Sequence, residues 1–208
     1  MKFKVPKDIE DSILNILLYR RIDYRFIQFI KNSSEKVQLH LIKQMVFGTK
    51  ELLKIINNPT TAFLKEVLRK DPDCLECIEP DLLTPEILEY FVQLPIEIEE
   101  GVSFIPLEQC IRYCKCIDLD IPESVYIASI KKYPFSIDLI DFPSEKMKLL
   151  AISEGYRLKS KWLKQGSEEI HLAAVSKTPS ILFSLKNPTE YVKQVALDTF
   201  INKINKME

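Results

Sequence analysis

Residues 167–188 have the sequence SEEIHLAAVSKTPSILFSLKNP, and this stretch contains the pattern that decides the fold. Related segments begin at Thr60, Pro122, Ser144 and Thr189, and the starts from Pro122 to Thr189 are 22, 23 and 22 residues apart. A short, fixed period predicts stacked repeats, in which one unit cannot bury its apolar face alone. We therefore expect an all-α fold, a HEAT-like helical-repeat solenoid with a right-handed stack of long and short helices.

Each unit carries its own signals for starting and stopping a helix. A Ser or Thr followed by an acid is typical of a helix amino terminus, where the hydroxyl accepts a free backbone N–H. Apolar residues three and four apart follow, as in Ile170, Ala173 and Ala174, which predicts a helix with one buried face. A proline then ends the helix, and a shorter apolar segment completes the unit. A lysine precedes the proline by two residues in three units: Lys70 and Pro72, Lys132 and Pro134, and Lys177 and Pro179.

The pattern divides the chain into five parts of one domain, residues 1–208. We expect an atypical amino-terminal cap of two helices over 1–32 and repeats over 33–94 and 122–188. Residues 95–121 form a degenerate unit or a loop, with a short β insertion near 95–106 and a helix from about Leu107 to Cys116. Residues 189–208 are expected to form a capping helix with a polar outer face, as terminal repeats require.

The units from Ser167 and Thr189 resemble a family of short helical repeats, a domain of unknown function found in bacterial, phage and giant-virus proteins. The resemblance implies a phage or viral protein and brings no catalytic residues to transfer. It does not extend over residues 95–121. The matching positions in the first of these units are Ser167, Glu169, Ile170, Leu172, Ala173, Ala174, Val175, Lys177, Pro179, Leu182, Leu185, Asn187 and Pro188.

The net charge of −1 hides an uneven distribution of charge along the chain. Basic residues outnumber acidic ones by 11 to 6 in residues 1–58 and by 13 to 9 in residues 126–208. Residues 59–125 carry 5 basic and 15 acidic residues. Such blocks are typical of solvated helix faces, and the alternative is an acidic central surface that meets a basic partner.

The sequence also indicates where the protein acts. It contains no apolar run long enough to span a bilayer and no secretory signal at its start. Its five cysteines lack the spacing of a disulfide scaffold. We expect a cytoplasmic protein without a membrane partner, located in the host cytoplasm if it is viral.

Few residues form a pattern that would support chemistry. Cys74 and Cys77 form a C-x-x-C pair, and Cys110, Cys114 and Cys116 follow, so a small zinc site ligated by Cys is a weak alternative to plain packing. His40 and His171 have no nucleophile or second ligand at a recognisable spacing, and no Gly-rich phosphate loop occurs. We therefore expect no catalytic residue, no cofactor and no metal ligand.

The function we expect is a non-enzymatic module that binds another protein, for example a host protein. The alternative is nucleic-acid binding through the basic terminal units. In residues 156–164, cations interleaved with aromatic residues either hold phosphates while a ring stacks on a base, or Trp162 packs inside and the lysines face water. The candidate partner-binding residues are Arg20, Arg21, Tyr24, Arg25, Glu97, Glu99, Glu100, Tyr156, Arg157, Lys159, Lys161, Trp162 and Lys164.

Overall fold

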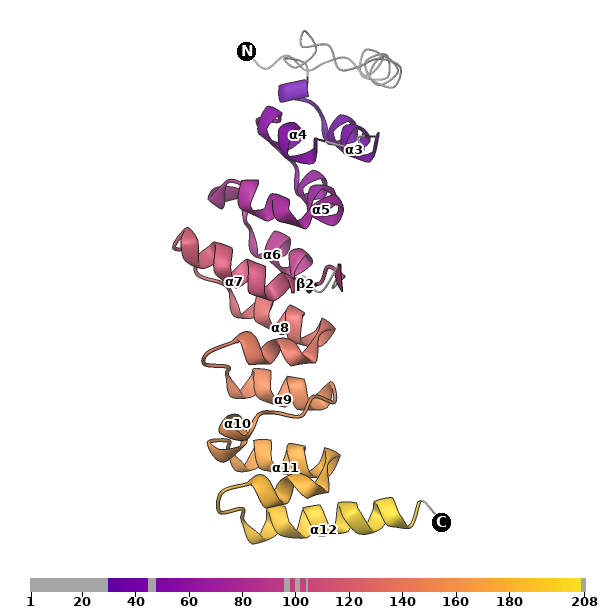
Figure 1. Cartoon of the computed structure of the whole chain (residues 1–208), viewed down its shortest axis with the longest axis vertical. Coiled ribbons are helices and arrows are strands. Elements are labelled where there is room, and N and C mark those ends of the chain that lie inside the picture. Colours follow the sequence, from indigo (N-terminus) through magenta and orange to yellow (C-terminus); the bar gives the residue numbers. More distant parts are fainter. Residues whose placement is uncertain (1–29, 45–47, 96–97, 100–101, 104, 207–208) are drawn as a thin grey trace. The chain divides into compact units, whose positions relative to one another are not determined.

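The computed structural model in Figure 1 describes residues 30–44, 48–95, 98–99, 102–103 and 105–206. These residues form two compact units. Unit 1 comprises the described residues up to residue 96 together with 109–120, and unit 2 comprises the others. The regular elements of the described residues are helices, apart from one ladder of two very short strands, which confirms the all-α class. That both units belong to one domain stays a prediction, and residues 1–29 of the expected amino-terminal cap lie outside the described residues.

Unit 1 is built around α5 (Thr61–Lys70), which packs against the helices that precede and follow it. Residues 109–116 of α7 (Pro106–Cys116) also belong to this unit, and this helix confirms the one expected from about Leu107 to Cys116. The remaining elements are α3 (Glu35–Gln44), α4 (Thr49–Ile55), η2 (Pro72–Cys77), η3 (Pro80–Leu82) and α6 (Pro85–Phe91).

Unit 2 contains four long helices in which each packs against the next, in the order α8 (Glu123–Lys132), α9 (Glu145–Ser153), α11 (Glu168–Lys177) and α12 (Glu190–Ile204). Shorter elements connect them: η4 (Pro134–Leu139), α10 (Ser160–Lys164) and η5 (Pro179–Ser184). The expected β insertion is a small antiparallel ladder of β1 (Ile98–Glu99) and β2 (Val102–Ser103), in which Ile98 pairs with Ser103. Figure 1 shows the succession of helices within each unit.

The predicted helix starts are confirmed by their hydrogen bonds. Five helices begin after a Ser or Thr whose hydroxyl accepts the backbone N–H three residues further on, at 3.3–3.4 Å. This bond satisfies one of the free N–H groups at each amino terminus. Helix α8 differs, because Pro122 stands at its cap position and forms no such bond. The five capping residues are Thr60, Thr84, Ser144, Ser167 and Thr189.

Two of these hydroxyls also contact an acid at the start of the preceding long helix. Ser144 Oγ donates to Glu123 Oε1 at 3.1 Å, and Thr189 Oγ1 donates to Glu168 Oε1 at 2.5 Å. In each pair the carboxylate belongs to the first turn of the preceding long helix. One side chain therefore caps its own helix and fixes the position of that helix against its neighbour.

The predicted proline breaks are confirmed in three units. Asp71, Tyr133 and Thr178 precede the prolines, and their φ angles of −146°, −135° and −139° are extended. A residue before proline is driven out of helical backbone by the proline ring, so the long helix must end there. A six-residue 3-10 helix then begins at each proline, as η2, η4 and η5. The unit from Ser144 has no such proline and turns instead at Gly155, whose φ is 86°.

The lysine of the repeated pattern bonds to the preceding long helix. Lys70 Nζ donates to the Lys43 carbonyl at 3.2 Å, and Lys177 Nζ donates to the Ser153 carbonyl at 3.4 Å. Lys203 repeats the arrangement without a following proline, because its Nζ donates to the Lys177 carbonyl at 2.6 Å. A cation at the carboxyl end of a helix satisfies free carbonyls and opposes the helix dipole.

Burial in unit 2 depends on contact between successive long helices. Val175 of α11 is fully buried and forms one cluster with Val192 and Ala196 of α12. Four partly buried residues complete this cluster, and they come from both long helices and from η5: Leu172, Leu182, Leu185 and Val195. A long helix therefore covers its apolar face with the helix of the next unit, as a repeat architecture requires.

Helix α12 confirms the predicted terminal helix but not its predicted surface. The expected polar outer face is wrong, because Leu197, Phe200, Ile201 and Ile204 are all exposed. The helix is also longer than α11 because no proline stops it after one unit length. An apolar face is therefore left uncovered by the described residues.

We predict that Thr189→Ala lowers the free energy of unfolding by about 1–2 kcal/mol, because it removes the cap of α12 and the bond to Glu168 together. Thr189→Ser keeps a hydroxyl in place and should recover most of this loss. Urea unfolding of both variants and the wild type measures the difference. Equal destabilisation by the two substitutions would show that the hydroxyl contributes nothing.

Candidate binding surfaces

The aromatic and basic segment 156–164 lies mostly inside unit 2. Trp162 is only 7% exposed, so its ring cannot stack on an external base. Lys161 Nζ lies 4.0 Å and Lys148 Nζ 5.5 Å from the centre of this ring, where the π face attracts a cation. The alternative in which Trp162 packs in the core is confirmed. A role for Trp162 in binding a partner stays a prediction.

Two further residues of this segment are used in internal contacts. The Tyr156 hydroxyl donates to Asp138 Oδ2 at 2.5 Å, and Lys159 Nζ pairs with the same oxygen at 3.0 Å. Burial and the bonded carboxylate raise the pKa of Tyr156 to about 12. Both contacts fasten the turn between α9 and α10 to η4, so Tyr156 and Lys159 hold the unit together.

The remaining sequence candidates are dispersed. Arg157, Lys161 and Lys164 are exposed on unit 2. Glu99 belongs to β1. The other candidates lie outside the described residues: Arg20, Arg21, Tyr24, Arg25, Glu97 and Glu100. Of the candidates that the structure describes, those of segment 156–164 therefore share one stretch of unit 2, whereas Glu99 lies on a different element.

The exposed stripe of α12 is a candidate surface that the sequence analysis missed. We use this name for Leu197, Phe200, Ile201 and Ile204, which are 52%, 54%, 45% and 44% exposed. Their spacing of three, four and seven residues places them on one side of the helix. That spacing was visible in the sequence, but the run was interpreted as a terminal helix with a polar outer face, and only Val192, Val195 and Ala196 were assigned to its apolar stripe.

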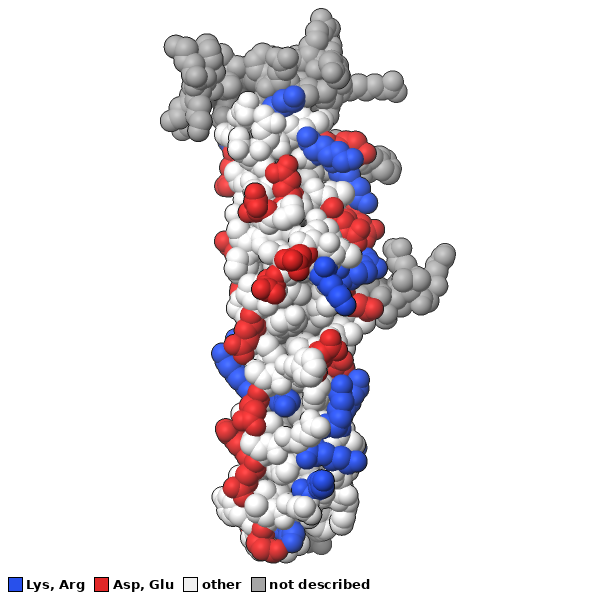
Figure 2. All heavy atoms as spheres, turned by 90° about the vertical axis from the view of Figure 1, so that its left-hand side faces the viewer, with Lys and Arg blue, Asp and Glu red and all other residues white. Residues whose placement is uncertain are grey.

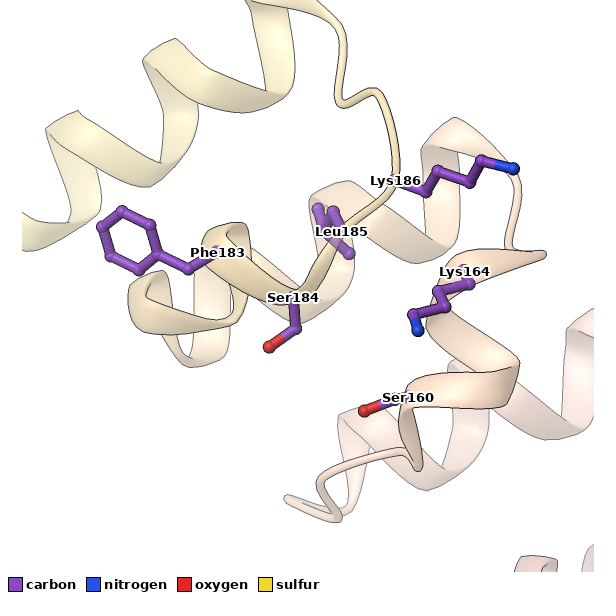
Figure 3. Close-up of a pocket in the computed structure, with 6 residues that line it drawn as sticks. All are labelled: Ser160, Lys164, Phe183, Ser184, Leu185 and Lys186. Carbon is purple, nitrogen blue, oxygen red and sulfur yellow. The ribbon is translucent and has the colours of Figure 1, made fainter.

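A second candidate is a hollow between α10 and η5, both in unit 2. It has a volume of about 630 Å³ and is lined by Ser160, Lys164, Phe183, Ser184, Leu185 and Lys186. Figure 3 shows the hydroxyls of Ser160 and Ser184 pointing into the same open space, with the ammonium of Lys164 near them. The Phe183 ring is turned outward from η5 and is 91% exposed.

The histidines have structural surroundings. His171 is buried, and its Nε2 lies 2.7 Å from the Leu163 carbonyl, to which the ring donates. His40 is half-buried, and its Nε2 has no hydrogen-bond partner among the described residues. Neither lies in a described group of metal-ligating side chains.

The cysteines do not form a metal centre within the described residues, which include all five of them. Cys74, Cys110 and Cys114 are fully buried, and every cysteine is a free thiol. Burial is the main cause that raises the pKa of Cys74 well above its ordinary value, and a hydrogen bond with Asp71 is the second. Both favour the neutral thiol. In the described part of the chain no three Cys, His, Asp or Glu side chains are placed to hold a metal ion.

None of the helices in the described part of the chain combines the length and apolar character that crossing a bilayer requires. Comparisons with models of protein families, with curated proteins and with solved structures found no match. The candidate surfaces must therefore be judged from their own geometry: an apolar stripe on α12 and a polar hollow beside η5.

We predict that Trp162→Ala lowers the free energy of unfolding by about 3 kcal/mol, because it removes the largest side chain from the core of this segment. Trp162→Phe should cost less because much of the volume is kept. Because Trp162 is the sole tryptophan, the wild type should also resist fluorescence quenching by iodide. A freely quenched tryptophan, or unchanged stability in Trp162→Ala, would contradict its burial.

The raised pKa of Tyr156 has a predictable effect at alkaline pH. An unfolded tyrosine ionises near pH 10, and the folded group ionises near pH 12. The stability that Tyr156 contributes is thus fully present below the unfolded pKa and is lost as pH rises through the folded pKa. The difference in urea midpoint between wild type and Tyr156→Phe should shrink across this interval. A constant difference would contradict the Asp138 bond.

Proposed function

We propose that the chain is a non-enzymatic HEAT-like helical-repeat protein that binds another protein. The exposed stripe of α12 is the observation that carries this proposal. Folded proteins rarely leave a contiguous apolar patch uncovered unless it is a contact surface. Because the units resemble repeats of phage and giant-virus proteins, the partner in this proposal is a host protein.

The repeat geometry supports an apolar helix as the group that covers the stripe. Leu197 occupies the position in α12 that Val175 occupies in α11, 22 residues earlier. Val175 is fully buried because α12 presents Val192 and Ala196 to it. Leu197 thus stands at the position that, in α11, is covered by the face of the following helix. A partner that lays an apolar helix on α12 would continue this packing.

Nucleic-acid binding has less support. Single-strand binding needs exposed rings beside a continuous row of cations, whereas Trp162 is buried and Lys159 is paired with Asp138. In the lower half of Figure 2, at the height of α8 to α12, acidic side chains lie mainly along the left and basic ones mainly along the right of one face. A polyanion on this face would meet carboxylates as well as cations. The zinc alternative finds no support among the described residues.

The test is affinity purification from the native source with the wild type, Phe200→Glu and Asn202→Glu. Both substitutions add one negative charge to exposed positions of α12, but Asn202 lies outside the stripe. We predict a stoichiometric protein that the wild type and Asn202→Glu retain and that Phe200→Glu loses. The purified pair should show the same order by calorimetry.

Two outcomes would contradict the proposal. In the first, Phe200→Glu retains the partner as well as the wild type does. In the second, light scattering shows a wild-type dimer that Phe200→Glu converts into a monomer, because a second copy would then cover the stripe. Unfolding of both variants should stay within about 0.5 kcal/mol of wild type, since the substituted side chains are exposed.

A further inference from the structure

The three 3-10 helices that begin at a proline can be compared position by position. Each spans six residues with the same pattern of backbone hydrogen bonds. Counted from the proline, the fifth and eighth positions are acids in the first two turns, Glu76 and Glu79 after Pro72, and Asp138 and Asp141 after Pro134. The equivalent residues after Pro179 are Phe183 and Lys186. The last turn thus lacks both acids and gains a ring and a cation.

The acid at the fifth position has a defined task in the first two turns. Glu76 Oε1 accepts from Arg112 at 3.0 Å, and Asp138 Oδ2 pairs with Lys159 at 3.0 Å. In both turns the acid meets a cation from a later segment of the same unit. In η5 no acid is present at that position, and Phe183 points outward instead. The first two turns therefore favour a positively charged group, whereas the turn at η5 favours a negatively charged one.

The two replaced positions both line the hollow between α10 and η5. Lys164 enters the hollow from α10, and neither it nor Lys186 forms an ion pair with any residue that the structure describes. Other lysines of unit 2 are engaged, since Lys177 and Lys203 bond to carbonyl groups. One ammonium and two hydroxyls thus face a space with no carboxylate in its lining, while the side chains of Phe183 and Lys186 at its edge are turned outward.

We propose that this hollow binds an acidic segment of a partner protein. Carboxylates of the segment pair with Lys164 and Lys186 and accept hydrogen bonds from the hydroxyls of Ser160 and Ser184, while an apolar side chain packs on Phe183. The flexible Lys186 side chain turns toward the segment on binding, because its ammonium points outward in Figure 3. This inference rests on the proposed function, because the acidic segment would be part of the partner protein that the chain binds.

An acidic peptide suits the hollow better than a nucleic acid does. The lining combines two cations with Phe183 and Leu185, so the ligand must offer both negative and apolar groups. A peptide supplies both on neighbouring side chains. A nucleic-acid backbone would need a longer row of cations than two lysines provide.

The experiment is fluorescence anisotropy with a labelled peptide of glutamates and leucines. A second peptide has glutamine in place of glutamate, and an oligothymidylate of equal net charge serves as the nucleic-acid probe. The variants are Lys164→Glu and Lys186→Asp, with Lys146→Asp as the control because Lys146 is an exposed lysine of α9 outside the hollow. Phe183→Asp tests the ring by restoring the acid of the other turns.

We expect the acidic peptide to bind and the glutamine peptide not to bind. Lys164→Glu, Lys186→Asp and Phe183→Asp should each raise Kd by about tenfold, because each loses a charge-assisted or apolar contact, while Lys146→Asp should match wild type. No binding, equal binding to the control and hollow variants, or tighter binding of the oligothymidylate would overturn the inference. Such a failure leaves the Phe200 test intact, so the two proposals fail separately.

Discussion

The contact between one long helix and the next is the interaction on which the rest of the structure depends. Even the long helices of the repeat have only a few turns, and a helix of that length is marginally stable on its own in water. Most of its stability must therefore come from tertiary packing. Val175 against Val192 and Ala196 shows how this packing is achieved in unit 2. Each helix offers one apolar face to the preceding unit and another to the following unit. On α12 the second of these faces, the exposed stripe, is not covered by any residue that the structure describes.

Polar groups fix the register of this packing. Thr189 caps α12 and bonds to Glu168 of α11, while Lys203 bonds to the carboxyl end of α11. In unit 1 the buried Gln38 of α3 has a similar task, because its amide donates to the Asn58 carbonyl and accepts from the Thr60 N–H. Such bonds satisfy groups at helix ends that would otherwise be costly to bury, and they fix the position of one helix relative to another.

Local rules explain what the sequence predicts well. Caps such as Ser167 and breaks such as that at Pro179 act within a few residues, so their spacing gives the helices directly. Exposure depends on neighbours that the local pattern does not contain. The sequence around Trp162, a tryptophan among lysines, would be the same whether the ring lay in a binding groove or in the core. The apolar residues on the outer face of α12 likewise have the same spacing as those on a buried helix face. The charge reversal at Lys186 was visible in the sequence, but its place beside Lys164 required the structure.

Hydrogen exchange in a variant of α12 tests the dependence of one helix on the next most directly. Val192→Asp puts a charge into the cluster that joins α11 and α12, without changing any residue of α11. We predict that the amides of α11 lose protection together with those of α12, while those of α3 and α5 in unit 1 keep theirs. If α11 keeps its full protection after α12 has lost its own, the long helices do not depend on one another and the repeat account is contradicted.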